Sequence, residues 1–488
     1  MAGLDGRGLP RRSLTSHTGG PRGATVSSEQ GAAVDLPELL TSLRRARGMS
    51  QGRLAELLCD LSGRPTVTRS EISRYERGVR TPSTYWKRWL AVALNVPVTH
   101  LERTAASGSV ILTGSGDDDS ADQLASSTRR SILESPWTPP GTLTAIAATS
   151  QGGLMDRRRY LISAGADLAN LATNWAGALD DPTRWSYASG RQLSEAVILS
   201  LEQRLDHLRH LDDAIGGSEL YPLASAEYAL MSKLADGADI DSPLGRRLLS
   251  ALAEAARICG WLNYDAGRHA SAQSFYVTAL RASSTAGDAE AGAHILGRMA
   301  DQVLNVGNPQ DALNLMRTAQ EQVAHRTTPR VRAMLHAFAG CALSRTGDRS
   351  RAAREFDAAR EAMSAGVHDD DPAWIYWMTD AEVGMLAGSA AHDLGDYRRA
   401  VDHYATARQS YDAHTYVRDT ALFLAREARA HLALGDVETA CATAAQALTF
   451  GGEISSARPS DTLSDFRAEL IPHRDVVAAR DFLELSAA

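Results

Sequence analysis

Apolar residues recur every three or four positions along much of this chain, which is the period of an amphipathic helix. In residues 36–48, Leu39, Leu40 and Leu43 fall on one helical face, and Gly48 is a suitable residue to end that helix. The same period continues through residues 191–236 and the C-terminal half. The pattern therefore predicts an all-α protein.

The segment 36–103 reads as several short helices with start and stop signals. Ser50 can cap a helix over 51–58, and Thr68 forms a capping box with Glu71. In the helix after Thr68, Ile72 and Tyr75 lie three positions apart and are expected to be buried. That leaves a polar set facing outward: Arg69, Ser70, Ser73, Arg74 and Arg77.

The C-terminal half contains an internal repeat that starts at five glycines: Gly267, Gly307, Gly347, Gly395 and Gly435. Alanine follows each glycine after five residues and again seven residues later. A small residue lies seven positions before each glycine, and four repeats have a large residue between the alanines. Small and large residues at fixed places let helix pairs pack closely and stack, so a helical superhelix is expected.

Charge is distributed unevenly along the 488 residues, which carry a formal net charge of −8. Residues 36–103 hold 12 lysines and arginines against 6 acids, so this segment is basic while the remainder is acidic. Only Lys87 and Lys233 are lysines, so any phosphate contact would come from arginine. A small basic segment before a large acidic one favours a polyanion-binding head on a separate body.

The segment "LRRARGMSQGRLAELL…VTRSEISRYERG" resembles the Xre/Cro-CI helix-turn-helix family over residues 37–103. In that family the second motif helix lies in the major groove of DNA. The resemblance implies base contacts from Arg69, Ser70, Glu71, Ser73 and Arg74. It implies phosphate contacts from Gln51, Arg77, Arg80 and Thr81, and a structural ion pair between Arg44 and Glu76.

Two of the residues assigned to DNA contacts have a simpler interpretation, and the sequence departs from the family pattern at one turn. Glu71 can serve only as the capping partner of Thr68, and Arg77 can serve only to solvate the end of its helix. The turn at 59–67 is longer than the family's usual turn and contains Gly63 and Pro65. This extra length puts the family's usual assignment of base positions in question, but not DNA binding.

The repeats resemble tetratricopeptide (TPR) repeats over roughly residues 250–450, with a unit longer than the family's usual length of about 34 residues. The resemblance implies a concave groove lined by the first helix of each pair. The family spacing also implies which residues lie near that groove. Candidate ligand residues there are Arg257, Trp261, Tyr264, Asp301, Asn305, Arg345, His392 and Arg429. The spacing places Glu254, His294, Glu382 and Ser389 near the groove as well. A solvated inner wall or contact with another subunit is the alternative. For the aromatic cluster Trp374, Tyr376 and Trp377, core packing or contact with another subunit is preferred over a ligand cage.

The expected organisation is a disordered leader at 1–35, a helix-turn-helix domain at 36–104, a linker at 105–155 and a TPR-like domain at 156–488. The leader lacks the apolar core of a signal peptide, and no run approaches the roughly 20 apolar residues of a membrane helix, so a cytoplasmic protein is expected. Within the linker, Trp137 lies between prolines and is the residue expected to be ordered.

The sequence contains no recognisable catalytic motif, and its four cysteines are far apart, so no enzyme activity, metal or cofactor is expected. We expect a transcriptional regulator that binds double-stranded DNA as a homodimer. Its TPR domain would mediate dimerisation and sense a peptide, a small molecule or a protein partner. The alternative is a protein-interaction scaffold that uses the helix-turn-helix domain as a docking module.

Overall fold

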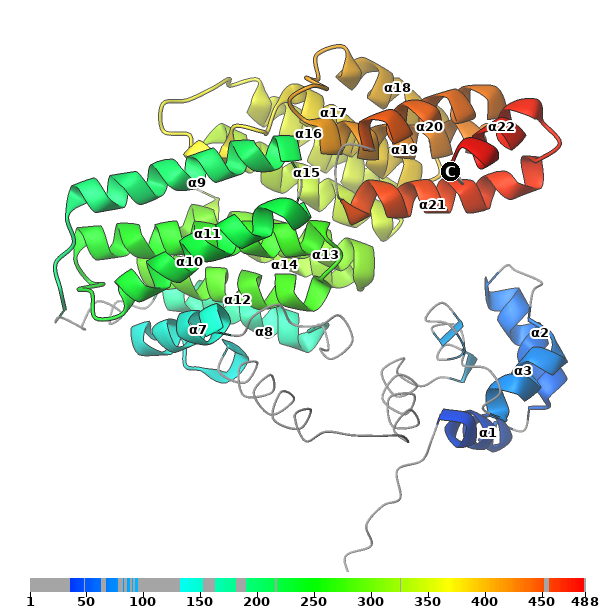
Figure 1. Ribbon diagram of the computed structural model, residues 1–488, viewed down its shortest axis with the longest axis horizontal. Coiled ribbons are helices and arrows are strands. Elements are labelled where there is room, and N and C mark those ends of the chain that lie inside the picture. The colour runs from blue at the N-terminus through cyan, green and yellow to red at the C-terminus, as the bar shows by residue number, and fades with distance from the viewer. Residues whose placement is uncertain are drawn as a thin grey trace, which may run out of the picture. The chain divides into compact units, whose positions relative to one another are not determined.

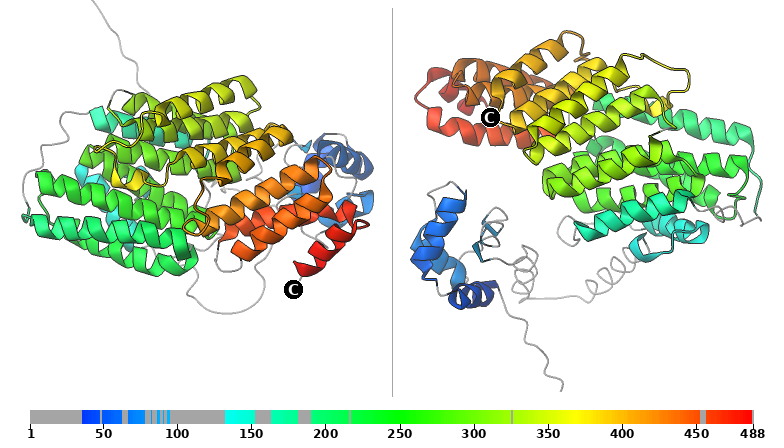
Figure 2. Two further views of the ribbon diagram at one scale, coloured as in Figure 1. Left: turned by 90° about the horizontal axis from the view of Figure 1, so that it is seen from above. Right: turned by 180° about the vertical axis from the view of Figure 1, so that it is seen from behind.

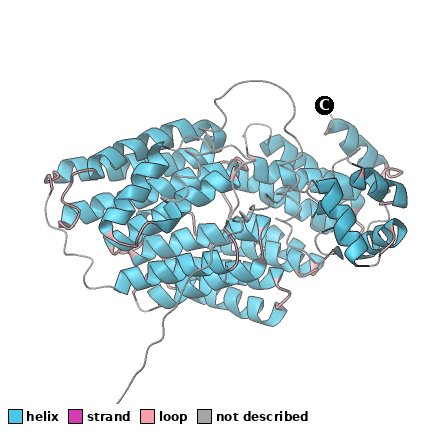
Figure 3. Ribbon diagram, turned by 90° about the horizontal axis from the view of Figure 1, so that it is seen from below, coloured by secondary structure: helices cyan, strands magenta, loops and turns pink. Residues whose placement is uncertain are grey.

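The computed structural model describes residues 36–47, 49–62, 67–77, 82, 86–87, 90, 93–94, 132–151, 163–180, 190–215, 217–324, 326–451 and 456–486. These residues are almost all in helices, and the one β-bridge among them pairs Arg191 with Ala238 (Figure 3). The all-α class is confirmed. By its contacts the chain separates into two compact units, Met1–Ser115 and Gly116–Ala488.

The first unit is built from α1 (Leu36–Ala46), α2 (Gln51–Ser62) and α3 (Arg69–Glu76). Leu40, Leu54 and Ile72 are each at most 2% exposed and form its core with Tyr75. The Thr68 hydroxyl accepts a hydrogen bond from the Glu71 backbone N–H at 3.3 Å, so α3 begins with the cap that the sequence predicts.

The second unit contains the remaining described helices: α7 (Pro139–Gln151), α8 (Ala166–Asp180), α9 (Glu195–Ile215), α10 (Gly217–Ala235), α11 (Pro243–Asp265), α12 (His269–Ala286), α13 (Ala289–Val306), α14 (Pro309–Val323), α15 (Pro329–Arg345), α16 (Arg349–Met363), α17 (Asp380–Asp393), α18 (Tyr397–Arg408), α19 (Val417–Ala433), α20 (Val437–Gly451), α21 (Ala457–Leu470) and α22 (Val477–Leu485), with 3-10 turns η2 (Ala373–Ile375) and η3 (Ile471–His473). None of the helices searched is both long enough and apolar enough to span a membrane.

From α11 to α20 the helices form five consecutive pairs, and each pair packs against the next (Figures 1 and 2). The two helices of a pair are joined by a short turn and run antiparallel. Each pair corresponds to one sequence repeat, so this part of the chain is a TPR-like stack. Four of the five glycines that start the repeats have positive φ, for example Gly347 at 81°, where glycine avoids the strain of a side chain.

Small residues in the first helix of a pair accept large residues from the second. A Cβ atom built on Gly340 would lie 2.7 Å from the Phe356 ring, and one on Gly388 would lie 2.7 Å from the Tyr404 ring. Gly260 faces Tyr276 in the same way, at 2.6 Å. These distances are shorter than van der Waals contact, so the repeats depend on glycine at these positions.

Part of the expected linker belongs to the folded second unit. Helix α7 packs on α10 and α12, and the Thr149 hydroxyl lies 2.7 Å from that of Thr278. Before α7, the Arg281 guanidinium lies 4.5 Å from the centre of the Trp137 ring and donates to the Pro136 carbonyl oxygen at 3.1 Å. Residues 132–151, which were expected to belong to the linker, are therefore part of the folded second unit, and residues 105–131 and 152–155 lie outside the described part of the chain.

The stack curls so that late helices contact early ones. Arg418 on α19 forms an ion pair with Asp212 on α9, with 2.9 Å between Nη1 and Oδ1. The Ser456 hydroxyl, just before α21, donates to the Asp265 carboxylate at the end of α11 at 2.7 Å. These contacts join residues about 200 positions apart and bring the first helices of successive pairs around a common interior.

Candidate functional site

Helix α3 presents a polar face opposite its buried one. Arg69, Ser70, Arg74 and Arg77 are exposed, whereas Ile72 is 1% exposed. Because the fold fixes which side of α3 is buried, Arg69 in its first turn and Arg74 and Arg77, three positions apart at its end, all project from the exposed part of the helix. This is the geometry that a major-groove helix requires.

The other two residues expected at base edges, Glu71 and Ser73, are half-buried on the same helix. The Arg74 guanidinium forms an ion pair with the Glu71 carboxylate at 3.2 Å, and Arg77 Nε donates to the Ser73 carbonyl oxygen at 3.2 Å. Each of these arginine side chains therefore has an intrahelical partner. The Arg74 side chain remains exposed in this ion pair, and a pair with one exposed partner at a helix surface contributes little to stability.

The expected pair of Arg44 and Glu76 lies at the junction of α1 and α3. Arg44 Nη2 donates to Glu76 Oε2 at 2.9 Å, and the two side chains are 10% and 6% exposed. Gln51 at the start of α2 donates to the same Glu76 oxygen at 2.7 Å. Hydrogen bonds from Arg44 and Gln51 hold the pKa of Glu76 below its ordinary value although burial opposes this.

Gln51 was expected to contact phosphate, and its side chain is instead hydrogen-bonded inside the domain. That internal bond holds the first turn of α2 against α3. The other two residues expected at phosphates, Arg80 and Thr81, lie outside the described residues, as does the centre of the long turn at 63–66.

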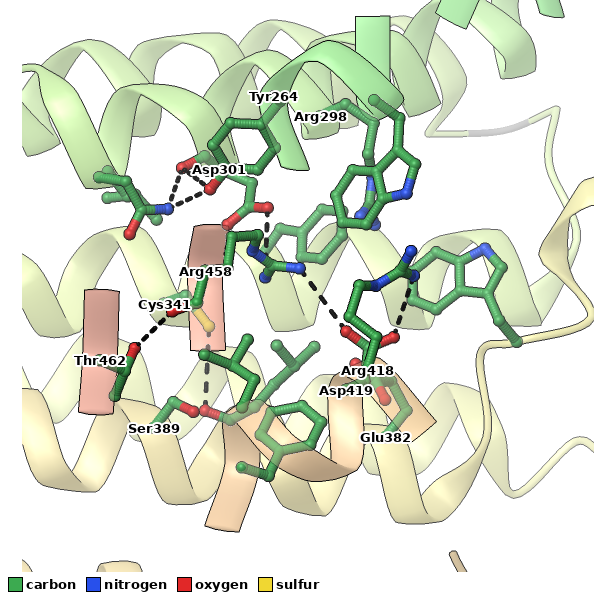
Figure 4. A pocket seen from close by; sticks show the side chains of 18 of the residues that line it. Tyr264, Arg298, Asp301, Cys341, Glu382, Ser389, Arg418, Asp419, Arg458 and Thr462 are labelled. Atoms are coloured by element: carbon green, nitrogen blue, oxygen red, sulfur yellow. Dashed lines mark hydrogen bonds and ion pairs between the residues drawn. The ribbon is translucent and has the colours of Figure 1, made fainter. Parts of the chain in front are cut away.

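In the second unit, a cavity of about 550 Å³ lies inside the curl of the helix stack (Figure 4). The first helices of successive pairs supply most of its wall, namely α11, α13, α15, α17 and α19. Helices α9 and α21, the segment around η2, the start of α12 and the segment between α18 and α19 supply the remainder. All eight candidate ligand residues line this one cavity, as do His294, Glu382 and Ser389. Glu254, which the family spacing also placed near the groove, is not among the residues that line it.

Most of those eight side chains are held by neighbours. Arg257 pairs with Glu254 at 2.8 Å, and Arg345 pairs with Asp393 at 3.3 Å. Arg429 pairs with Glu469 at 2.6 Å. The remaining contacts are Trp261 Nε1 donating to Asp212, Asn305 donating to the Tyr264 hydroxyl, and Asp301 lying 3.9 Å from Arg458. His392 lines the wall next to Asp393.

The aromatic cluster at 374–377 lies between α16 and α17, where one repeat is longer than the others. The Trp374 ring stacks on His294 with 4.2 Å between ring centres, and Tyr376 donates to Asp213 on α9 at 2.6 Å. The cluster therefore packs, as expected, and its three aromatic side chains also line the cavity. Packing and cavity lining thus coincide at these three residues, which their spacing in the sequence does not indicate.

Arg298, Arg418, Arg426 and Arg458 also line the cavity and were not singled out from the sequence. The helical register gave a signal for two of them. Arg298 lies four residues after His294 and three before Asp301, and Arg426 lies three before Arg429. Arg298 therefore shares a helical face with Asp301, and Arg426 shares one with Arg429, both of which were candidate groove residues.

Burial shifts the titration of several cavity groups. It raises the pKa of the Glu382 carboxyl to about 8, with the nearby Asp419 charge adding to the effect. Burial also raises the pKa of Asp213 to about 7 and, together with Arg429 and Arg426, lowers the pKa of His392 to about 4. At neutral pH the Glu382 carboxyl and the His392 imidazole are therefore largely uncharged, and Asp213 is partly protonated, beside the fixed charges of the arginines.

Comparison with known proteins assigns the first unit. Residues 35–104 match a family model described as a helix-turn-helix domain. No curated protein matches the sequence. The solved structure of Bacillus thuringiensis PlcR in complex with the peptide PapR7 and DNA is 12% identical, with 77% of this chain and 96% of that chain covered and a TM-score of 0.23. A TM-score this low supports no argument about the fold, so the helix stack is described from the contacts within this chain.

Proposed function

We propose that this chain is a DNA-binding transcriptional regulator of the Xre/Cro-CI type, acting in the cytoplasm, whose second unit binds an effector in the central cavity. The observation that carries the proposal is a helix-turn-helix domain whose second motif helix, α3, exposes Arg69 and Arg74. Helix-turn-helix proteins use that helix to read base edges. No catalytic role is proposed for the chain.

In this proposal Arg69 and Arg74 contact base edges, with Ser70, Glu71 and Ser73 contributing from the same face. Arginine can donate two hydrogen bonds to guanine O6 and N7, which is worth roughly 1–3 kcal/mol of discrimination against the wrong base. In the Glu71–Arg74 pair the Arg74 side chain is 53% exposed and the Glu71 side chain 14%, so we propose that the guanidinium exchanges this partner for a base.

Phosphate contacts would come from Arg77, Arg80 and Thr81 after the recognition helix, and from the start of α2 at Gln51. Main-chain N–H groups at a helix start favour a phosphate. The Gln51 side chain already bonds to Glu76, so we propose that Gln51 contacts phosphate through the main chain rather than through its amide.

One helix-turn-helix domain has limited affinity, so we propose a homodimer that binds two half-sites, with the second unit supplying the dimer contacts. The effector would be a short peptide, a small molecule or a protein segment. A cavity of about 550 Å³ falls within the range of roughly 300–1,000 Å³ typical of ligand sites. Binding would shift the population between DNA-competent and incompetent arrangements.

The test is selection of bound sequences from random duplex DNA with the purified full-length chain. We expect the double variant Arg69→Ala, Arg74→Ala to lose its sequence preference. The matched control is Arg45→Ala, Arg47→Ala, which removes the same charge from two exposed positions at the end of α1. The control should weaken binding to all sequences alike while keeping the preference.

If the two double variants select the same sites, the assignment of base contacts is wrong. The alternative function is an interaction scaffold with a docking module. It predicts no enrichment of any sequence by the unmodified chain.

A further inference from the structure

One arginine in the cavity, Arg298, has no carboxylate or hydrogen-bond partner in the described part of the chain. Arg298 on α13 has its Nε and Nη2 atoms buried without a hydrogen-bond partner. No carboxylate in the described part of the chain lies within ion-pairing distance of it. Its guanidinium carbon instead lies 4.7 Å from the Phe338 ring centre, 4.8 Å from that of Trp377 and 5.2 Å from that of Trp261 (Figure 4).

Its neighbours show that an unpaired arginine is not the rule here. Six of the eight arginines that line the cavity among the described residues have a carboxylate within 4 Å: Arg209, Arg257, Arg345, Arg418, Arg429 and Arg458. Arg426 has no such carboxylate, but its Nη1 donates to the Ser389 hydroxyl at 2.9 Å. Arg298 alone in this set has neither kind of partner.

A buried guanidinium without a partner is unfavourable, because it has lost water and gained no acceptor. The three aromatic rings stabilise its positive charge through their faces. They offer no lone pairs to the N–H groups, however, so the hydrogen-bonding capacity of Arg298 remains unused. An oxyanion entering from the cavity would satisfy it with two parallel hydrogen bonds.

The rest of the wall limits the charge of that oxyanion. Eight carboxyl groups and eight arginines line the cavity among the described residues, and burial raises the pKa of two of these carboxyls, Glu382 and Asp213. Asp461 on α21 has no ion pair in the described part of the chain, and Asp301 meets Arg458 only at 3.9 Å. A second negative charge on the ligand would meet these carboxylates, so a monoanion fits better than a phosphate dianion.

We propose that Arg298 binds the carboxylate of a small organic acid, whose apolar part packs against Trp261, Phe338 and Trp377. This inference rests on the proposed role of the cavity as an effector site. It adds the chemical class of the effector, a monocarboxylate with a planar or apolar body, and the residue that recognises its charged group.

The test uses the full-length protein and three probes of increasing size, namely acetate, phenylacetate and indole-3-acetate, each compared with its neutral amide. Binding is followed by tryptophan fluorescence, since Trp261 and Trp377 adjoin Arg298, and by calorimetry. We expect at least one acid to bind and to exceed its amide by roughly 10- to 100-fold in affinity. Phenylphosphonate loses its second proton near neutral pH, so it is compared at a mildly alkaline pH, where it is a dianion and is expected to bind more weakly than phenylacetate.

Arg298→Met should abolish the advantage of the acid over the amide. Arg354→Met on the outer helix α16 is the matched control, because Arg354 is exposed, and it should behave like the unmodified chain. A purely structural arginine would lower the melting temperature when replaced and leave the preference for acids intact. We expect the melting temperature of Arg298→Met to be unchanged or raised, because an uncompensated buried charge is removed.

Three results would overturn the inference: no acid binds, the amides bind equally well, or Arg298→Met retains the preference. Tighter binding of phenylphosphonate would overturn the assignment to a carboxylate. Binding of duplex DNA by the same preparation is measured separately. Protein that binds DNA but no acid refutes this inference alone, and protein that binds an acid but no DNA refutes the regulator function.

Discussion

Buried charged side chains in this protein differ in what compensates them. Glu76 receives hydrogen bonds from Arg44 and Gln51, and its pKa is lowered. Glu382 receives one hydrogen bond from the Tyr411 hydroxyl at 3.3 Å and has its pKa raised to about 8. The first arrangement stabilises the fold of the DNA-binding unit. The second leaves a protonated acid in the cavity at neutral pH.

Replacing Glu382 by glutamine should change how stability depends on pH. In the unfolded chain the Glu382 carboxyl ionises near pH 4.3, and in the folded chain near pH 8, so the folded state binds more protons between these values. The unmodified protein therefore loses stability as the pH rises from about 4 to 8. Glu382→Gln avoids this loss and should be more stable above pH 8, by on the order of 1–3 kcal/mol.

The measurement is denaturant unfolding of both proteins from pH 5 to 9. Asp419 on α19, Arg298 on α13 and Arg458 on α21 also face Glu382, and they are the same in both proteins, so their contribution cancels in the difference. Glu361→Gln, at an exposed position on α16, is the control and should give a flat difference. A flat difference for Glu382→Gln as well would refute the raised pKa.

At the scale of helices, each repeat packs a small residue of one helix against a large residue of the next. The first helix of a pair carries a small residue, and the second carries a large one that covers it, as Phe356 covers Gly340. Gly177 on α8 offers a contrast, because no atom lies within 4 Å of a Cβ built there. Glycine is thus required by close packing at position 340 and is not required by packing at position 177.

Replacing each of these glycines by alanine distinguishes a tightly packed glycine, Gly340, from one with no close neighbour, Gly177. Gly340→Ala should destabilise the protein by about 1–3 kcal/mol, because its Cβ would overlap the Phe356 ring. Gly177→Ala should stabilise it by roughly 0.5–1 kcal/mol, because alanine favours the helix and meets no neighbour. Thermal unfolding followed by circular dichroism measures both. Equal shifts in the same direction would contradict this packing of small against large residues.

The elements that the sequence predicted are those with a local or periodic signal. The cap at Thr68, the buried face of α3 and the helix pairs from α11 to α20 all follow from spacing alone. The groove residues, Arg257 to Arg429, followed from the repeat register, and they line one cavity as a set. Periodicity succeeds here because each repeat must present the same face to its neighbours.

The elements that the sequence could not place depend on contacts between distant segments. Helix α7 and the residues just before it have the composition of a linker. Thr278 holds α7 and Arg281 holds the segment before it, and both lie more than 100 residues later in the chain. The Arg418–Asp212 ion pair spans 206 positions. The isolation of Arg298 depends on which acids reach the other arginines. No local pattern encodes these outcomes.

At the scale of the whole molecule, the two units divide the work that we propose. The first is a helix-turn-helix domain with exposed arginines, and the second is a curled helix stack whose interior is closed by contacts between α9, α11, α19 and α21. Because one cavity is lined by six or more helices, a ligand there can influence the curvature of the whole stack. Such a change is the means by which we expect an effector to alter DNA binding.

The central claim is that this chain binds duplex DNA through α3, and titration of the full-length protein against a duplex across a range of salt concentrations tests it most directly. The account predicts tight binding at low ionic strength that weakens linearly on a log–log plot, with a slope of about −0.9 for each phosphate neutralised. Failure to bind any duplex at low salt, with or without an added effector, would contradict it.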